Sequence, residues 1–147
     1  MAITKRIALV AHDDCKRDLI AWARHNRKAL EKYDLIATGT TGTNLAKICQ
    51  LKVKCLKSGP LGGDQQLGSM IADGLLDIII FFWDPMTSQP HDVDVKALLR
   101  MSVLYNIPTA CNRATADYLI TSPLFDAVYR PILKDYAQYL KRSVQEF

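Results

Sequence analysis

The chain has 147 residues, of which 49% are hydrophobic and 23% are charged, with 7 glycines and 6 prolines. This composition excludes disordered, collagen-like and coiled-coil proteins, and the length fits one domain, which we expect to span residues 1–147. Lys and Arg outnumber Asp and Glu by 19 to 15, a net charge of +4. Because the basic residues are scattered, we expect no nucleic-acid partner, while the mild positive charge suits a small anionic substrate.

The N-terminal sequence and the cysteines indicate in which cellular compartment the protein is expected. Lys5 and Arg6 interrupt the stretch where a signal peptide needs a continuous apolar region, and the most apolar run, residues 78–83, is too short to cross a bilayer. None of the 4 cysteines forms a CxxC pair. We therefore expect a cytoplasmic protein without a membrane partner, whose cysteines are reduced and mostly buried.

Apolar runs alternate along the chain with longer amphipathic segments. The runs, which predict strands, are residues 6–11, 34–37, 53–56, 77–82 and 108–111. The amphipathic segments, which predict helices, are residues 15–30, 44–49, 64–72, 93–105, 115–121 and 132–144. Several runs are apolar at every position, which is typical of strands covered on both faces. The pattern predicts an α/β fold: a three-layer, open, mainly parallel sheet of about five strands flanked by helices.

Polar and glycine-rich residues follow each predicted strand. Parallel strands place their carboxyl ends at one edge of the sheet, where ligands of open α/β sheets bind. The segments brought together there are residues 12–14, 38–42, 58–64, 83–94 and 112–113. We therefore expect one site built from loops that lie far apart in the sequence.

Residues 38–42, with the sequence TGTTG, open a predicted helix. Helix N-termini present unpaired N–H groups, glycine lets an anion approach closely and threonine hydroxyls add donors, so the segment is a candidate phosphate site. It matches neither the Walker nor the dinucleotide-binding spacing, and a simple threonine N-cap is the alternative. Ser58 and Gly59 could add donors, or form a mobile connector. Lys16 could add a point charge, or be a solvated surface residue.

Asp64 follows two glycines and begins a predicted helix, so it is either an N-cap or a general base at the ligand edge. The chain has 3 histidines. His25 lies in a charged helical stretch and is expected to be exposed, whereas His12 and His91 fall at the ligand edge.

Further acidic residues surround His91. With Asp92 and Asp94 it has the ligand types of a metal site, but His12 is the one further nitrogen donor and the cysteines lie elsewhere, so we expect no metal. Asp92 or Asp94 could instead cap the helix that follows. Asp84 could orient a histidine or cap a turn, and the preceding Trp83 is expected to form a core wall.

Seven segments together resemble the methylglyoxal synthase family. They are ALVAHD (residues 8–13), ATGTTG (37–42), SGPLGGDQQ (58–66), FFWDP (81–85), HDVDVKALLR (91–100), NIP (106–108) and CNRATAD (111–117). They occur in the expected order between about residues 6 and 139. The strings GGDQQ, FWDP and HDxDVKALLR in combination are highly specific.

The resemblance implies a lyase with a Rossmann- or flavodoxin-like fold that converts dihydroxyacetone phosphate to methylglyoxal and inorganic phosphate. It implies no metal or other cofactor, a homohexamer, and phosphate as product and inhibitor. Asp64 matches the catalytic base. Positions matching phosphate and substrate contacts are His12, Lys16, Thr38, Gly39, Thr40, Thr41, Ser58, Gly59 and His91, and those matching further acidic residues of the site are Asp13, Asp84 and Asp94.

In the implied mechanism Asp64 removes a proton next to the substrate carbonyl, which requires that the developing enediolate be stabilised. A neutral His91 donates a hydrogen bond to the enediolate oxygen and helps to move protons, with Asp94 or Asp84 fixing its tautomer. Asp13 binds substrate hydroxyls or joins the proton network. The phosphate contacts then stabilise the charge of the departing phosphate.

Two other functions fit parts of the pattern. The regulatory domain of carbamoyl phosphate synthetase looks similar in fold and uses a comparable phosphate loop, so a non-catalytic effector-binding module is one alternative. The joint presence of Asp64, His91 and Asp94 favours an enzyme instead. The other alternative is a sugar-phosphate isomerase, which would release glyceraldehyde 3-phosphate and no free phosphate.

Overall fold

The computed structural model describes residues 4–142 and is built on a five-stranded sheet in the order β3-β2-β1-β4-β5, with every neighbouring pair parallel. The strands are β1 (Arg6–Ala11), β2 (Asp34–Thr38), β3 (Val53–Leu56), β4 (Ile78–Phe82) and β5 (Thr109–Ala110). This confirms the predicted fold class. The predicted strands are displaced by at most one residue at either end, as expected for strands defined by apolar runs.

Each central strand faces two separate hydrophobic cores. Along β1, Ile7 and Leu9 enter the core under α1 (Lys16–His25), whereas Ala8 and Val10 enter the core under α4 (Gly63–Ala72) and α5 (Asp92–Leu104). Because side chains alternate across a strand, both faces need apolar residues. The unbroken apolar runs of the sequence are the consequence.

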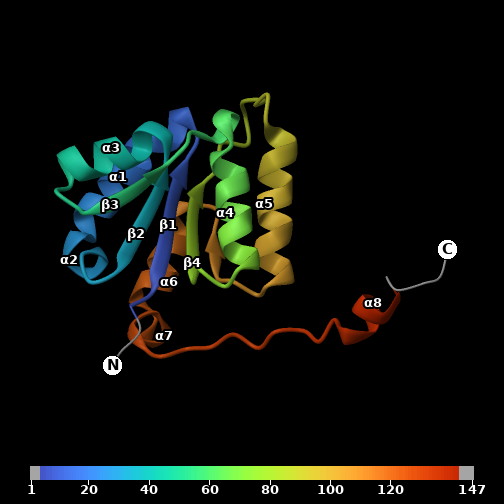
Figure 1. The fold of residues 1–147 in the computed structure, drawn as a ribbon. Helices are drawn as coiled ribbons and strands as arrows, with labels where there is room; N and C mark the ends of the chain where they lie inside the picture. Colours follow the sequence, from blue (N-terminus) through green and yellow to red (C-terminus); the bar gives the residue numbers. More distant parts are fainter. Residues whose placement is uncertain (1–3, 143–147) are drawn as a thin grey trace.

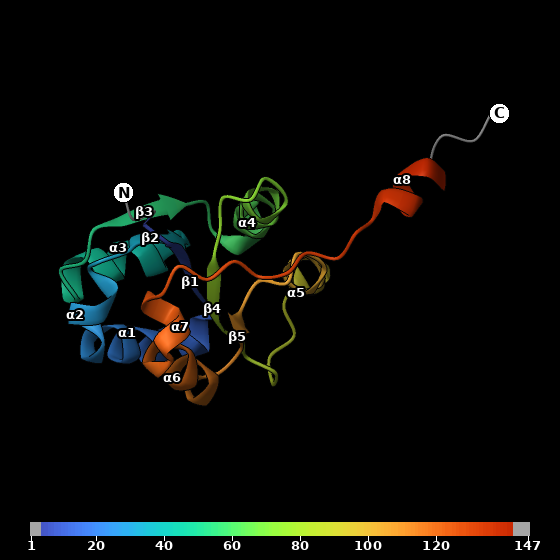
Figure 2. The same cartoon turned by 90° about the horizontal axis from the view of Figure 1, so that it is seen from below.

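Helices cover both faces of the sheet (Figure 1). One face carries α1, α2 (Arg27–Leu30), α3 (Gly39–Ile48), α6 (Arg113–Thr121) and α7 (Pro123–Asp126), and the other carries α4 and α5. Two 3₁₀ turns, Asp13–Cys15 and Gly59–Leu61, precede α1 and α4. Figure 2 shows the layers from below, with the sheet between the two sets of helices.

Before residue 127, two predicted helices have bounds that differ from the observed ones by more than two residues. The segment of residues 15–30 breaks at Asn26, whose side-chain amide donates to the Trp22 carbonyl oxygen at 2.9 Å and so ends α1. In the other direction, α3 begins at Gly39, five residues before the predicted start. Threonine and glycine have low helix propensity, but Thr41 and Gly42 are buried, and packing overrides propensity there.

The C-terminal part differs most from the prediction. The expected helix of residues 132–144 is extended up to residue 136, and α8 covers only Ala137–Arg142; residues 143 and 144 lie outside the described residues. We call residues 127–142 the C-terminal arm. It crosses the lower edge of the sheet, where the Asn106 amide donates to the Ile132 carbonyl oxygen at 3.0 Å and the Tyr136 hydroxyl to the Leu104 carbonyl oxygen at 3.4 Å. Beyond these contacts α8 projects away from the body (Figures 1 and 2).

Two predictions about apolar residues were wrong in part. All four cysteines are free, but only Cys49 is fully buried; Cys15 and Cys111 are half-buried and Cys55, on the edge strand β3, is exposed. Trp83 is 42% exposed and is not a core wall, because the chain leaves the sheet directly after β4.

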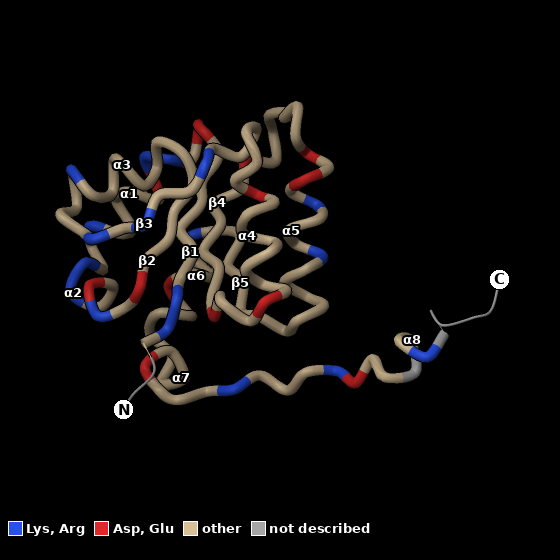
Figure 3. The backbone as a smooth tube through the Cα atoms, in the orientation of Figure 1, with Lys and Arg blue, Asp and Glu red and all other residues tan. Residues whose placement is uncertain are grey.

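The structure agrees with the sequence in how its charged residues are scattered and in its lack of a long apolar helix among the described residues. Figure 3 shows basic residues interspersed with acidic ones over the helices, the lower strand ends and the arm. Within residues 4–142, no helix is long and apolar enough to span a bilayer.

Candidate active site at the carboxyl edge of the sheet

A cavity of about 240 Å³, lined mainly by polar residues, lies at the carboxyl edge of the sheet. There β1 lies between β2 and β4, so the connections leaving β1 and β4 diverge and open a crevice between them. Eleven residues of the predicted site line this cavity: His12, Asp13, Lys16, Thr38, Gly39, Thr40, Thr41, Ser58, Gly59, Asp64 and His91. The structure thus brings together residues that are up to 79 positions apart in the sequence (His12 to His91).

The cavity lining differs from the predicted site at a few positions. Asp84 and Asp94, both predicted from the sequence as acidic residues of the site, are not among the lining residues. The lining residues outside the predicted site are Val10, Ala11, Pro60, Phe81 and Gln89. Four of these five lie in strand ends or a turn, where the sequence predicts backbone structure but no chemical role. Gln89 lies in the loop between β4 and α5. Its polar side chain and its place in a loop at the ligand edge are the features from which it could have been predicted.

One end of the cavity is formed by the first turn of α3. Thr38 occupies the N-cap position but makes no side-chain capping bond, so simple capping does not explain this residue. Gly39 has a φ of +54°, and a Cβ there would lie 3.0 Å from the Ser58 Cβ. Glycine therefore allows the two loops to approach each other closely at the cavity.

Lys16 ties this turn to the first helix. Its Nζ donates to the Thr40 Oγ1 at 2.7 Å and lies 2.8 Å from the Asp13 Oδ1. The hydrogen bond and charge of Lys16 hold the pKa of Asp13 below its ordinary value, although the Asp13 side chain is 90% exposed. The geometry thus places a cation next to a threonine hydroxyl at the start of a helix, which is an arrangement that suits a phosphate group.

Asp64 lies at the other end of the cavity, in the first turn of α4. The N-cap of α4 is Gly62, with a φ of +108°, and no side chain caps the helix, so Asp64 is not a capping residue. Its carboxyl group is buried, and Oδ2 has no hydrogen-bond partner. Burial raises the pKa of Asp64, an effect that nearby His91 partly opposes. A raised pKa makes a carboxylate a stronger base once it is ionised.

His91 faces Asp64 across the cavity. Its Nε2 lies 3.7 Å from the Asp64 Oδ2, which is too long for a hydrogen bond but close enough for the two groups to interact electrostatically. The expectation that Asp94 or Asp84 fixes the tautomer of His91 was wrong, because the buried Nδ1 of His91 has no hydrogen-bond partner. The Asp84 carboxylate instead accepts from the Met86 amide at 2.9 Å and closes its own turn.

Gly59 packs directly against this pair. A Cβ at Gly59 would lie 2.9 Å from the His91 Nε2 and 3.2 Å from the Asp64 Oδ2. A side chain at this position would therefore occupy the space between the base and the histidine.

Four buried side-chain polar atoms in the described part of the chain lack a hydrogen-bond partner, and all four belong to cavity-lining residues. They are His12 Nε2, Thr41 Oγ1, Asp64 Oδ2 and His91 Nδ1. Buried polar atoms are normally paired, because an unpaired group costs about 1–3 kcal/mol. Their concentration at one cavity indicates that a polar ligand completes them.

The arrangement of possible metal ligands bears on the alternative that His91, Asp92 and Asp94 bind a metal ion. Among residues 4–142, no group of three or more His, Cys, Asp or Glu side chains is arranged to hold a metal ion. Asp92, one of the candidate ligands, accepts from the Gln89 main-chain amide at 3.2 Å and so shapes the loop before α5.

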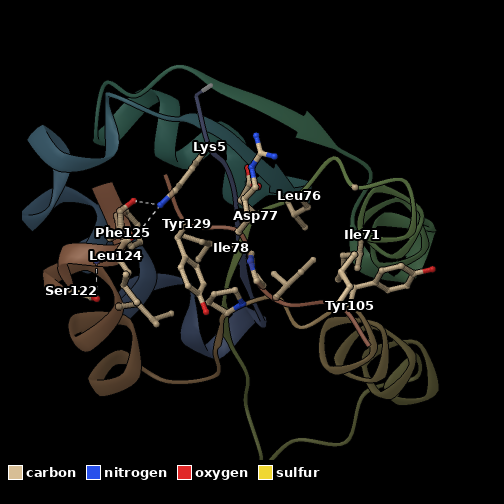
Figure 4. A pocket seen from close by; sticks show the side chains of 17 residues that line it. Lys5, Ile71, Leu76, Asp77, Ile78, Tyr105, Ser122, Leu124, Phe125 and Tyr129 are labelled. Carbon is tan, nitrogen blue, oxygen red and sulfur yellow. Dashed lines mark hydrogen bonds between the residues drawn. The ribbon is translucent and has the colours of Figure 1, made fainter. Parts of the chain in front are cut away.

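A second cavity of about 300 Å³ lies at the opposite edge of the sheet, beneath the arm (Figure 4). It is largely apolar, and the Lys5 ammonium at its rim already donates to the Leu124 and Phe125 carbonyl oxygens. None of the four unpartnered polar atoms lines it. Catalytic chemistry is therefore assigned to the cavity at the carboxyl edge.

Comparison with known proteins agrees with this site. The family model described as the MGS-like domain matches residues 18–111. An MGS-like α/β domain with a phosphate-type loop and a buried carboxylate at the switch between β1 and β4 is thus the class that the fold and site define. A methylglyoxal synthase from Leptospira interrogans is 56% identical over 139 residues, covering 95% of this chain and 94% of the relative.

Two further comparisons extend across the chain. A methylglyoxal synthase from Oleidesulfovibrio alaskensis is 57% identical, covering 94% of this chain and 95% of the relative. The crystal structure of methylglyoxal synthase from Elizabethkingia anophelis has 53% identity and a TM-score of 0.91, covering 98% and 95% of the two chains. The chain belongs to the methylglyoxal synthase family.

Proposed function

We propose that this protein is a carbon–oxygen lyase that converts dihydroxyacetone phosphate to methylglyoxal and inorganic phosphate. The observation that carries the proposal is the buried, unpaired Asp64 carboxylate, 3.7 Å from His91, in a cavity whose other end is the threonine–glycine turn of α3. A base at one end and an anion site at the other match a substrate with an acidic C–H bond and a phosphate.

The phosphate end of the substrate occupies the first turn of α3. Main-chain N–H groups of that turn, the Thr40 and Thr41 hydroxyls, Ser58 and the Lys16 ammonium supply donors. The unpartnered Thr41 hydroxyl supports this placement, since the phosphate would satisfy it. The same donors stabilise the charge of the phosphate as it leaves.

The carbon end lies between Asp64 and the histidines. The Asp64 carboxylate removes a proton from the hydroxymethyl carbon next to the carbonyl, and the electron pair of that C–H bond forms an enediolate. N–H donors from His12 and His91 stabilise the negative oxygen. The enediolate then expels phosphate by breaking the C–O bond, which leaves the enol of methylglyoxal, and this enol gains a proton on its methylene carbon and loses one from its hydroxyl oxygen to become the dicarbonyl product.

The same enediolate has a second fate, and conformation selects between them. When the C–O bond to phosphate stands perpendicular to the enediolate plane, its orbital overlaps the π system and elimination is fast. When the bond lies in the plane, elimination is slow and an isomerase results. Holding the phosphate and the reacting carbons at separate ends of the cavity would fix this torsion, and the products released show which conformation the site selects.

The decisive experiment incubates purified protein with dihydroxyacetone phosphate in the presence of a metal chelator and measures both inorganic phosphate and the dicarbonyl. We expect equal amounts of the two products and no effect of the chelator. Glyceraldehyde 3-phosphate without free phosphate would make the protein an isomerase. Binding without turnover would make it an effector-binding module.

We also propose a homohexamer, with inorganic phosphate acting as a competitive inhibitor at the α3 turn. The arm supports assembly: α8 has six residues, fewer than an isolated helix needs in water, and the arm exposes Ile132 by 86%, Leu133 by 62% and Tyr139 by 67%. A second copy of the chain would cover these side chains.

The compartment and the domain organisation complete the proposal. We place the enzyme in the cytoplasm, which the four free cysteines support because reducing compartments keep thiols unpaired. We also treat residues 1–147 as a single domain, supported by the shared sheet and its two continuous cores.

A further inference from the structure

The two histidines of the cavity are held in different ways. The His12 ring accepts a hydrogen bond at Nδ1 from the main-chain amide of Asp84, with an N···N distance of 3.1 Å, and this bond is buried. A main-chain N–H can only donate, so Nδ1 must carry a lone pair. In the neutral ring the proton then lies on Nε2, which has no partner and belongs to the cavity.

The donor of this bond is firmly placed. His12 follows β1 and its own amide donates to the Phe82 carbonyl oxygen of β4 at 3.2 Å, so the two chain segments are joined beside the ring. The Asp84 carboxylate holds the turn after β4 by accepting from the Met86 amide. The position of the Asp84 amide is therefore set by main chain and a closed turn, and does not depend on a mobile side chain.

Protonation of His12 at Nδ1 is opposed from several sides. It would break the bond to the Asp84 amide in a buried place, where the Phe81 ring packs edge-on at 5.2 Å and the His91 ring at 5.9 Å. Burial and His91 lower the pKa of His12, while the carboxylates of Asp64, Asp84 and Asp92 act in the opposite direction. The hydrogen bond to the amide adds to the effect of burial and favours a neutral ring at neutral pH.

We propose that the main-chain amide of Asp84 sets the tautomer of His12 and so makes the His12 Nε2–H a permanent hydrogen-bond donor to the substrate carbonyl oxygen. The identity of that oxygen rests on the proposed function. His12 then acts as a catalytic residue that stabilises the enediolate without exchanging protons. Asp84 is a positioning residue, and its carboxylate acts through the turn, not on a histidine ring.

Nitrogen NMR tests the tautomer directly. The chain has only three histidines, and His25 is exposed and serves as an internal reference. In ¹⁵N magic-angle-spinning spectra of histidine-labelled protein, we expect a His12 signal of the Nε2–H tautomer that stays neutral between pH 6 and 8, and that disappears in the His12→Gln variant. An Nδ1–H tautomer or an imidazolium in this range would overturn the proposal.

Two variants test the catalytic consequence. Gln keeps an N–H donor near the Nε2 position but cannot titrate, whereas Leu removes the donor at similar size. We expect His12→Leu to lower kcat by about 100- to 1000-fold, the usual effect of removing one donor to a developing oxyanion, and His12→Gln to lower it by about tenfold or less. Equal losses in the two variants would show that His12 must transfer a proton and would overturn the proposal.

The spectra and the rates separate two possible failures. If the protein does not convert dihydroxyacetone phosphate, the proposed function fails, and the ¹⁵N spectrum still decides which nitrogen of His12 carries the proton. If conversion occurs but His12 becomes an imidazolium between pH 6 and 8, the proposed function stands and the fixed donor is refuted. Binding of inorganic phosphate by both variants checks that the site has kept its structure.

Discussion

Asp64 combines two demands that oppose each other. A carboxylate buried at 4% exposure without a hydrogen-bond partner at Oδ2 is destabilising for the fold, because burial disfavours the charged form. The same burial raises its pKa and keeps water from competing for the substrate proton. The residue is therefore explained by chemistry and not by folding.

Replacing this carboxylate separates binding from chemistry. We expect Asp64→Asn to lower kcat by about 10²- to 10⁴-fold, the range for loss of a general base, with little change in the affinity for inorganic phosphate, which binds at the other end of the cavity. Steady-state kinetics and phosphate titration measure the two effects. Asp73→Asn, an exposed change at the other end of α4, is the matched control. Near-normal turnover of Asp64→Asn would remove Asp64 as the base.

The raised pKa of Asp64 also predicts how stability depends on pH. The folded protein holds this proton more tightly than the unfolded chain, so the contribution of Asp64 to stability falls as pH rises from the ordinary value of 3.8 through the folded pKa. The loss remains at neutral pH. We expect Asp64→Asn to raise the free energy of unfolding by about 0.5–2 kcal/mol at pH 7, with the difference shrinking in acid. Urea denaturation at pH 7 and at an acidic pH, at one protein concentration, measures this difference in the free energy of unfolding. A variant less stable than the wild-type protein at pH 7 would refute the prediction.

Gly59 sets the space between the base and the histidine. A methyl group there would lie 2.9 Å from the His91 Nε2, so Gly59→Ala must push the ring or the Asp64 side chain aside. Misplacement of catalytic groups by about 1 Å can cost 10²-fold in rate, and we expect a loss of kcat of about 10- to 100-fold. Gly68→Ala is the control, because a Cβ at Gly68 meets nothing within 4 Å. Equal kinetics for the two variants would contradict this role of Gly59.

At the scale of elements, the first turn of α3 contains residues with low helix propensity at the place where the cavity needs the N–H groups of a helix start. Gly42 in this turn packs closely against β3, since a Cβ there would lie 2.6 Å from the Cys55 Sγ and the cysteine side chain would have to move. The helix therefore starts at the carboxyl end of β2 with its N–H groups at the cavity, although its first residues are poor helix formers.

Loss of donors from this turn should weaken substrate binding more than chemistry. A hydrogen bond to a charged group contributes about 1.5–3 kcal/mol, so we expect Thr40→Ala and Lys16→Ala each to raise KM and the inhibition constant of phosphate by about 10- to 100-fold. Thr43→Ala and Arg17→Ala are matched controls, as both residues are exposed neighbours on the same helices. An unchanged KM for both Thr40→Ala and Lys16→Ala would count against the phosphate site.

At the scale of the whole molecule, the arm is the part that the body does not explain. It is tethered at Ile132 and Tyr136 and then carries α8 away from the sheet. The apolar side chains of Ile132 and Leu133 are exposed to solvent in the single chain, and a second copy of the chain would cover them.

Assembly can be measured with a change confined to the arm. We expect the wild-type protein to sediment as six chains and the double variant Ile132→Asp/Leu133→Asp to sediment as smaller species, because a buried charge without a partner opposes association. Lys134→Gln, an exposed polar change between the same contacts, should leave the assembly intact. A monomeric wild-type protein, or an unchanged double variant, would refute the role of the arm.

The sequence by itself determined the parts that depend on local pattern. Apolar runs placed the five strands within one residue at either end, and the rule that parallel strands share a carboxyl edge gathered Asp64, His91 and the residue 38–42 segment into one predicted site. These inferences succeed because burial on both faces of a strand imposes an apolar residue at nearly every position.

The tertiary structure decided what depends on contacts between distant residues. It alone showed that Asp84 serves His12 through its main chain and not His91 through its carboxylate, that Asp94 lies outside the cavity wall and that the arm leaves the body. Which atom meets which depends on the relative placement of separate strands and turns. Tautomers, unpaired atoms and the start of α3 follow from that packing, which no local pattern of residues contains.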